Sequence, residues 1–137
     1  MAAKTIASAK GEYWYKGDTM TFNNYVKEQK IKSPLVVLCG NNTASAAEDF
    51  LITLDGLKGR ATTIGQRTYG STGQPLPLIL PGFTARVCTK RDTYPDGRDF
   101  VGVGVIPDIE VPRTPDDVIK GTDAVLKRAL KEINNKK

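Results

Sequence analysis

The longest unbroken run of apolar residues in the chain predicts a buried strand. Residues 35–39, Leu-Val-Val-Leu-Cys, are preceded by a proline and followed by a glycine. Such a run is typical of a strand buried on both faces of a parallel sheet that helices cover on each side.

The next two segments complete a β-α-β unit. Apolar residues at helical spacing predict a helix over 45–57, which Lys58 and Gly59 would end. Residues 61–64 then predict a second short strand. Strands joined in this way are expected to lie parallel, with their carboxyl ends at the same edge of the sheet. The helix face predicted to be buried consists of Phe50, Leu51, Leu54 and Leu57.

Beyond residue 65 the apolar positions alternate with the period of a strand. Residues 75–80 and 83–89 predict a hairpin about a Pro-Gly turn, and its prolines favour a place at a sheet edge. A second turn is expected at 95–97 and a short extended piece at 109–111.

Two helices are predicted at the C-terminal end. Thr114, followed by proline and two aspartates, is a strong helix start, and Thr122 or Asp123 caps a second helix that runs to about Asn134. The side chains expected to face inward are Val125, Leu126, Ala129, Leu130 and Ile133.

The chain has 137 residues, the length of one domain, with 20 Lys and Arg, 15 Asp and Glu, and no histidine. The net charge of +5 permits contact with nucleic acid, but the basic residues are scattered, so no such partner is expected. No apolar stretch approaches the roughly 18 residues of a membrane span. The lack of histidine excludes a His-based triad or metal site carried wholly by this chain.

The first 33 residues are predicted to form a segment of their own, a loop with a short helix within 12–31, ahead of the domain at 34–137. This segment lacks the apolar core of a signal peptide. The two cysteines, Cys39 and Cys88, are too few for a disulfide framework or a zinc site, and both are predicted to be buried free thiols.

The connection between the first strand and its helix carries the candidate chemistry. Ser45 precedes Glu48 by three residues, the spacing of a capping box. In the structural interpretation, Ser45 only caps the helix. In the functional one, Ser45 is a nucleophile at the positive end of the helix dipole, and the N–H of Ala46 binds an oxyanion.

A nucleophilic serine needs a general base, and no histidine can serve. Lys58 would lie about 20 Å from Ser45, at the far end of the helix, and is excluded. Lys90, on the predicted hairpin, stays open as a base. Asp99 stays open as a residue that orients a partner in the site, whereas Asp108 follows a proline in a turn and is predicted to be structural.

Three parts of the sequence together resemble the C-terminal processing peptidases, tail-specific serine proteases whose family includes the tricorn core protease. They are Asn-Asn-Thr-Ala-Ser-Ala-Ala-Glu at 41–48, Arg-Ala at 60–61 with Gly-Gln-Arg-Thr-Tyr-Gly at 65–70, and Asp-Gly at 96–97 with Gly-Val-Gly-Val-Ile-Pro-Asp-Ile-Glu-Val at 102–111. Each motif is modest alone, and their order and spacing make the resemblance specific.

The resemblance implies an α/β fold of the crotonase and Clp protease type, with stacked ββα units around a mainly parallel sheet. It assigns the nucleophile to Ser45 and the oxyanion N–H to Ala46, while Glu48 stays the helix cap partner that the capping-box spacing predicts. It further implies cleavage of a polypeptide substrate by acyl transfer, no metal or organic cofactor, and an extracytoplasmic location, periplasmic or secreted.

Two departures from the family pattern concern the base and the rest of the fold. The lysine base of the processing proteases falls on Ser71, whose hydroxyl is not a useful base near neutral pH. The family's Asp-Leu-Arg, Asn and Gly-Gly segment, with its strand and second oxyanion donor, has no counterpart in 1–33. We therefore expect a truncated domain, inactive by itself, whose free sheet edge pairs with a second copy.

The loop after the second strand contains Ser71, which is expected to lie close to Ser45 because parallel strands end at the same edge. Its neighbours Gly70, Thr72 and Gly73 either line the substrate cleft or form a plain flexible loop. Two other functions stay open: a non-catalytic peptide-binding domain on the same fold, and an acyl-CoA enzyme of the crotonase type, for which no nucleotide-binding feature is present.

Overall fold

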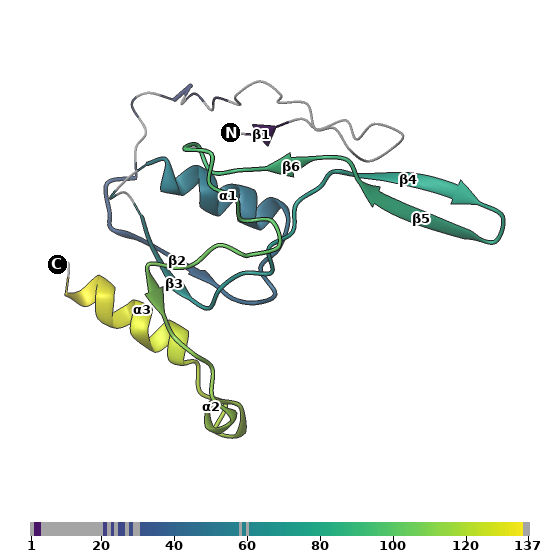
Figure 1. The fold of residues 1–137 in the computed structure, drawn as a ribbon. Helices are drawn as coiled ribbons and strands as arrows, with labels where there is room; N and C mark the ends of the chain where they lie inside the picture. Colours follow the sequence, from purple (N-terminus) through teal and green to yellow (C-terminus); the bar gives the residue numbers. More distant parts are fainter. Residues whose placement is uncertain are drawn as a thin grey trace.

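The computed structural model describes residues 2–3, 21, 23, 25–26, 28, 31–57, 59 and 61–135. Its centre is a parallel sheet of three strands in the order β2-β3-β7, formed by Leu35–Cys39, Ala61–Gly65 and Ile109–Glu110. Leu35 pairs with Ala61 and Cys39 with Gly65, so the predicted β-α-β unit is confirmed. Helix α1 (Ala46–Asp55) lies on one side of this sheet and α3 (Ala124–Asn134) on the other (Figure 1).

The core lies between the sheet and α1. It is a cluster of buried side chains from β2, from α1 and from the segment after β6 (Arg91–Asp92), which pairs with β1 (Ala2–Ala3). The rings of Tyr94 and Phe100 meet edge to face, 6.1 Å apart. The members of the cluster are Cys39, Leu51, Ile52, Tyr94, Phe100 and Val105.

The predicted buried face of α1 is wrong in part. The helix ends at Asp55, and Phe50 and Leu57 are 53% and 56% exposed. The side chains that face the core are Glu48, Leu51 and Ile52, which have the i, i+3, i+4 spacing of one helix face. The apolar pattern missed this face because one of its members is a glutamate.

The prediction that β2 is buried on both faces is also wrong in part, since Leu38 is 43% exposed. Leu38 points to the α3 side, where α3 and α2 (Pro115–Ile119) leave a groove instead of packing closely. In the part of the chain that the structure describes, no strand pairs with the edge of β2 that faces away from β3.

The predicted hairpin is confirmed, and it forms a two-stranded sheet of its own in which each strand is an edge strand. Strands β4 (Pro75–Leu80) and β5 (Phe83–Cys88) pair with each other alone and project from the body of the molecule (Figure 1). Nearly all of its side chains are therefore exposed, and Cys88, which was expected to be buried, is exposed with them.

The C-terminal helices begin where the sequence predicts. The Thr114 side chain accepts a hydrogen bond from Asp117 N–H at the start of α2, and Asp123 accepts one from Leu126 N–H at the start of α3. Of the residues expected to face inward, Ala129 is buried, whereas Leu126 and Leu130 are about half exposed because α3 covers only part of β2 and β3.

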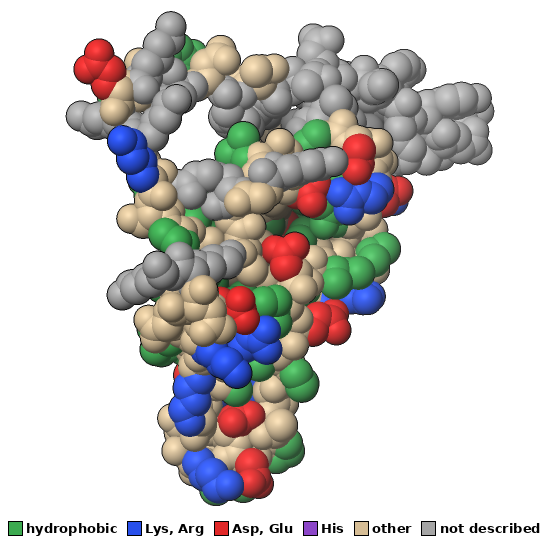
Figure 2. All heavy atoms as spheres, turned by 90° about the vertical axis from the view of Figure 1, so that its left-hand side faces the viewer, with side chains coloured by type: hydrophobic (Ala, Val, Ile, Leu, Met, Phe, Trp, Pro, Cys, Tyr) green, Lys and Arg blue, Asp and Glu red, His purple; other side chains and the backbone are tan. Residues whose placement is uncertain are grey.

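The helix expected within 12–31 falls mostly on residues outside the described part. None of the described helices has the length and apolar character needed to cross a membrane. On the face seen in Figure 2, basic and acidic side chains are mixed with apolar ones, and no large area of a single charge forms. On this face, the charges are thus distributed, as the sequence suggests.

Candidate functional site

Ser45 occupies a strained turn between β2 and α1. It is the N-cap of α1, with φ 56° and ψ −124°, a backbone conformation that favours glycine. Its N–H lies 2.7 Å from the Ser71 carbonyl oxygen and 3.0 Å from Glu48 Oε2. The prediction that Ser45 begins a helix close to Ser71 is confirmed, and the residue is exposed.

The N–H of Ala46 is suited to an anion. Ala46 is the first residue of α1, so its N–H has no carbonyl partner within the helix. It has no hydrogen-bond partner elsewhere among the described residues, and the positive end of the helix dipole lies here. A carbonyl oxygen beside Ser45 could therefore receive this N–H as it acquires negative charge.

The Glu48 carboxylate joins the Ser45 turn to the loop after β3. It is completely buried and accepts the hydroxyl of Thr68, the N–H of Gly70 at 2.6 Å and the N–H of Ser71 at 2.8 Å, in addition to Ser45 N–H. Four donors compensate a carboxylate that would otherwise be costly to bury. Glu48 is thus a helix cap partner that also positions a second loop.

The loop at 70–73 is packed against its surroundings, and the N–H groups of Gly70 and Ser71 donate to Glu48. Gly70, Thr72 and Gly73 are buried, and Ser71 is half-buried. Gly70 has φ 84°, and a Cβ atom there would lie 2.6 Å from the Gly104 nitrogen. Whether this loop lines a substrate cleft stays a prediction.

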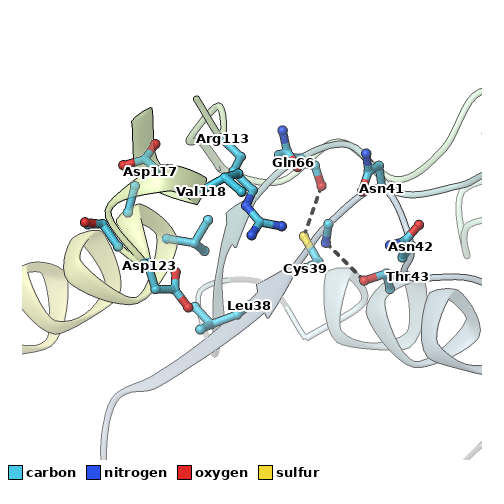
Figure 3. A pocket seen from close by; sticks show the side chains of 15 residues that line it. Leu38, Cys39, Asn41, Asn42, Thr43, Gln66, Arg113, Asp117, Val118 and Asp123 are labelled. Carbon is cyan, nitrogen blue, oxygen red and sulfur yellow. Dashed lines mark hydrogen bonds between the residues drawn. The ribbon is translucent and has the colours of Figure 1, made fainter. Parts of the chain in front are cut away.

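A groove of about 690 Å³ begins two residues before Ser45, at the carboxyl ends of β2 and β3. Its wall includes the side chains of Asn41, Asn42 and Gln66, and the Arg113 guanidinium points into it from the segment before α2 (Figure 3). Amide and guanidinium groups around an apolar floor can bind the backbone of an extended polypeptide.

The Cys39 thiol forms part of this floor, and its Sγ lies 3.6 Å from the Gln66 carbonyl oxygen. Burial, and to a smaller extent the nearby Asp108 carboxylate, raise the pKa of the Cys39 thiol. Cys39 is therefore a poor nucleophile, which leaves Ser45 as the candidate at this edge of the sheet.

The other candidates do not meet Ser45. Lys90 forms an ion pair with Asp92 at 2.8 Å, and Asp99 forms one with Arg91 on the surface. Asp108 accepts hydrogen bonds from the N–H and hydroxyl of Thr63 at 2.7 and 2.8 Å, which confirms its structural role. No cluster of metal-ligating side chains occurs within the described ranges.

Sequence reasoning missed Thr68, whose hydroxyl also accepts a hydrogen bond from Val105 N–H at 2.7 Å. The signal was its position three residues after the end of β3, within the Thr-Tyr-Gly segment, where a buried hydroxyl can contact the neighbouring turn.

Comparison with known proteins gives a consistent result. Residues 1–111 match the family described as peptidase family S41. A carboxy-terminal-processing protease of Bartonella bacilliformis is 31% identical over 123 residues, or 88% of this chain and 27% of that protein. This chain thus spans about a quarter of that relative.

Two solved structures are similar in fold. Mature CPAF superposes with a TM-score of 0.62 at 27% identity, over 74% of this chain and 21% of that one. A candidate peptidase of Parabacteroides merdae also gives a TM-score of 0.62, at 24% identity, over 88% of this chain and 36% of that one. The small α/β unit with its parallel sheet, hairpin and C-terminal helix therefore corresponds to part of these larger structures.

Proposed function

Because the chain belongs to peptidase family S41, we propose that it carries the nucleophile half of a serine endopeptidase site. Ser45 is the nucleophile, and the Ala46 N–H is one of the oxyanion donors. The observation that carries this proposal is the strained φ of 56° at an exposed serine on a strand-to-helix turn. Nucleophilic serines in α/β hydrolases are held on turns of this kind.

In the proposed reaction, Ser45 Oγ attacks the carbonyl carbon of a peptide bond while a base takes its proton. The carbonyl oxygen becomes an oxyanion that the Ala46 N–H and the helix dipole stabilise. The amine then leaves with a proton, and water hydrolyses the acyl-enzyme to restore Ser45. The groove beside Asn41 and Asn42 is the proposed place for the polypeptide.

The base is proposed to come from outside this set of residues. The chain has no histidine, Ser71 occupies the position of the family's lysine, and Lys90 is engaged with Asp92. A partner segment would also supply the second oxyanion donor and complete a crotonase-type fold. The edge of β2 that pairs with no strand among the described residues, together with the exposed Leu38, supports such a segment. An extracytoplasmic location stays a prediction.

The test is labelling with a fluorophosphonate probe, together with turnover of an unfolded casein substrate. We expect the 137-residue chain to be silent and a longer protein that includes the preceding sequence to be labelled and active. Ser45→Ala should abolish both signals in the longer protein. Thr84→Ala is the control, because Thr84 is an exposed hydroxyl residue on β5 of the projecting hairpin, and it should retain both.

Other outcomes would contradict particular parts of the proposal. Activity that survives Ser45→Ala would identify another nucleophile. Activity of the short chain would place a base within it or in a second copy. Silence of the longer protein would favour the non-catalytic peptide-binding alternative, to which Ser71 at the lysine position already lends support.

A further inference from the structure

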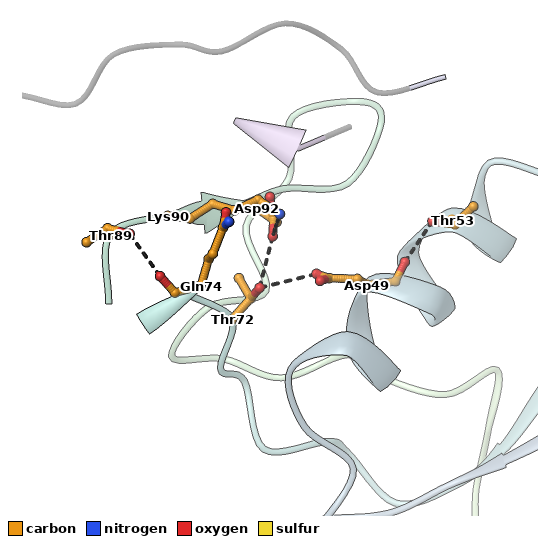
Figure 4. Close-up of polar contacts among 7 residues, drawn as sticks. All are labelled: Asp49, Thr53, Thr72, Gln74, Thr89, Lys90 and Asp92. Atoms are coloured by element: carbon orange, nitrogen blue, oxygen red, sulfur yellow. Dashed lines mark hydrogen bonds and ion pairs between the residues drawn. The ribbon is translucent and has the colours of Figure 1, made fainter. Parts of the chain in front are cut away.

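A second buried polar cluster joins α1 to the root of the hairpin. Its members are Asp49 on α1, Thr72 in the loop after β3, Lys90 after β5 and Asp92 on β6 (Figure 4). Asp92 is 1% exposed, and the Lys90 side chain is 15% exposed. The proposed peptidase chemistry uses none of these side chains.

The hydrogen bonds of this cluster lack one donor. Asp92 Oδ2 accepts from the Thr72 hydroxyl at 2.9 Å and pairs with the Lys90 ammonium at 2.8 Å. The same Thr72 oxygen lies 3.3 Å from Asp49 Oδ1, but its single proton cannot serve both carboxylates. Asp92 Oδ1 is buried and has no hydrogen-bond partner among the described residues.

The charges of the cluster also favour one additional bound proton. The charged groups that face Asp49 are the Asp92 carboxylate and the Lys90 ammonium, while the loop contributes only the Thr72 hydroxyl. With both carboxyl groups ionised the buried cluster has a net charge of −1, and with one proton bound it is neutral. Burial, then the Asp92 carboxylate, raise the pKa of Asp49, and Lys90 opposes this rise.

We propose that Asp49 holds a proton beside the Asp92 carboxylate, with Lys90 as the counter-ion of the cluster, and that this clasp tightens the contact between α1 and the hairpin root as the pH falls. A protonated Asp49 supplies the missing donor, either to Asp92 Oδ1 or to the Thr72 oxygen. Asp49 itself then titrates above the ordinary aspartate pKa of about 3.9, as its raised pKa indicates.

The clasp acts on the Ser45 turn through one intervening residue. Thr72 follows Ser71, whose carbonyl oxygen accepts the Ser45 N–H at 2.7 Å. On the other side, the N–H groups of Thr89 and Lys90 both donate to the Gly73 carbonyl oxygen, at 2.9 and 3.1 Å. Loss of the proton therefore loosens the hairpin root and the loop that holds Ser45.

The sign of the pH effect follows from the raised pKa of Asp49. The proton on Asp49 stabilises the folded state fully at pH values below the pKa of Asp49 in the unfolded chain, and this stabilisation is lost as the pH rises through the pKa of Asp49 in the folded chain. Each unit by which the folded pKa exceeds the unfolded one changes the opening equilibrium by about tenfold.

The test uses the complete 137-residue chain and measures amide exchange of Thr89 and Lys90 from about pH 4, near the ordinary aspartate pKa, up to about pH 8, corrected for intrinsic exchange rates. We expect protection in the wild type to fall as the pH rises. Asp49→Asn, which has the shape of the protonated acid, should keep high protection throughout. Asp99→Asn removes an exposed carboxylate of the Arg91 pair and should retain the wild-type pH dependence.

Protection that does not change with pH, or an Asp49→Asn variant that follows the wild-type curve, would overturn the proposal. If Asp49→Asn does not fold, carboxyl ¹³C titration of the wild type decides: the cluster must show a transition above the ordinary aspartate range. No step needs peptidase activity, so failure here leaves the proposed function untouched.

Discussion

Replacing Glu48 with glutamine should destabilise the fold much more than any neutralised surface carboxylate. A glutamine places an NH₂ group at one of the two carboxyl oxygen positions. At the Oε2 position this group would face two main-chain N–H groups, those of Ser45 and Ser71, so it is expected at the Oε1 position. There the Thr68 oxygen can accept from it, but Gly70 N–H loses its acceptor.

The magnitude follows from these contacts. An orphaned buried N–H costs about 1–3 kcal/mol, and each of the two remaining hydrogen bonds loses about 1 kcal/mol with the charge. Easier burial of a neutral side chain offsets part of this loss. We therefore expect Glu48→Gln to lower the free energy of unfolding by about 2–4 kcal/mol, a large part of the roughly 5–15 kcal/mol that holds a domain folded.

The assay is urea unfolding followed by far-UV circular dichroism, with linear extrapolation to water. Glu132→Gln is the matched control, since Glu132 forms an exposed ion pair with Arg128 on α3 and should cost less than about 0.5 kcal/mol. Amide exchange at Ser45, Gly70 and Ser71 should accelerate in the Glu48 variant. If both variants have the same stability as the wild type, the four-donor network does not stabilise the fold.

Three further predictions concern backbone strain and thiol reactivity. Ser45→Gly should be at least about 1 kcal/mol more stable than Ser45→Ala in thermal denaturation, because only glycine relieves the positive φ; equal stabilities would contradict this strain. Gly65→Ala should prevent folding, as judged by circular dichroism, since its Cβ would lie 1.8 Å from the Cys39 carbonyl oxygen, whereas Gly40→Ala meets no atom within 4 Å and should fold. Iodoacetamide at about pH 8 should modify the exposed Cys88 before the buried Cys39. Because the pKa of the Cys39 thiol is raised, its alkylation should accelerate as the pH rises further. Mass spectrometry gives the order of modification, and Cys39 reacting first would contradict this prediction.

The sequence predicts those parts of the fold that depend on neighbouring residues. The apolar run of β2, the caps at Thr114 and Asp123, and the Pro-Gly turn of the hairpin are local signals, and each appears where expected. Each of these features is determined by residues within a few positions of one another, so tertiary contacts do not overrule them.

The errors concern features that depend on distant parts of the chain. Leu38 was predicted to be buried because an unbroken apolar run is typical of a strand with helices on both faces. On the face of Leu38, the helices cover the strand incompletely and leave a groove. The separation of the hairpin from the central sheet was not predicted, because alternation alone does not say what a strand pairs with. Glu48 is the cap partner that the sequence predicts, but its second role was missed because three of its four donors come from the Thr68–Ser71 loop, about 20 positions further along the chain.

The backbone conformation of Ser45 helps to decide whether this residue only caps α1 or is a nucleophile. The chain contains two other described N-caps for comparison: Thr114 has φ −100° and ψ 157°, and Asp123 has φ −100° and ψ 93°. Both are extended, as is usual for residues that only cap a helix. Ser45, at φ 56° and ψ −124°, instead has a conformation that costs about 1–3 kcal/mol and needs surrounding contacts to hold it. The buried Glu48 carboxylate and the Ser71 carbonyl oxygen, which both accept the Ser45 N–H, supply those contacts. A serine that only capped the helix would require neither the strain nor the buried charge, so the combination supports the proposal that Ser45 is held for chemistry.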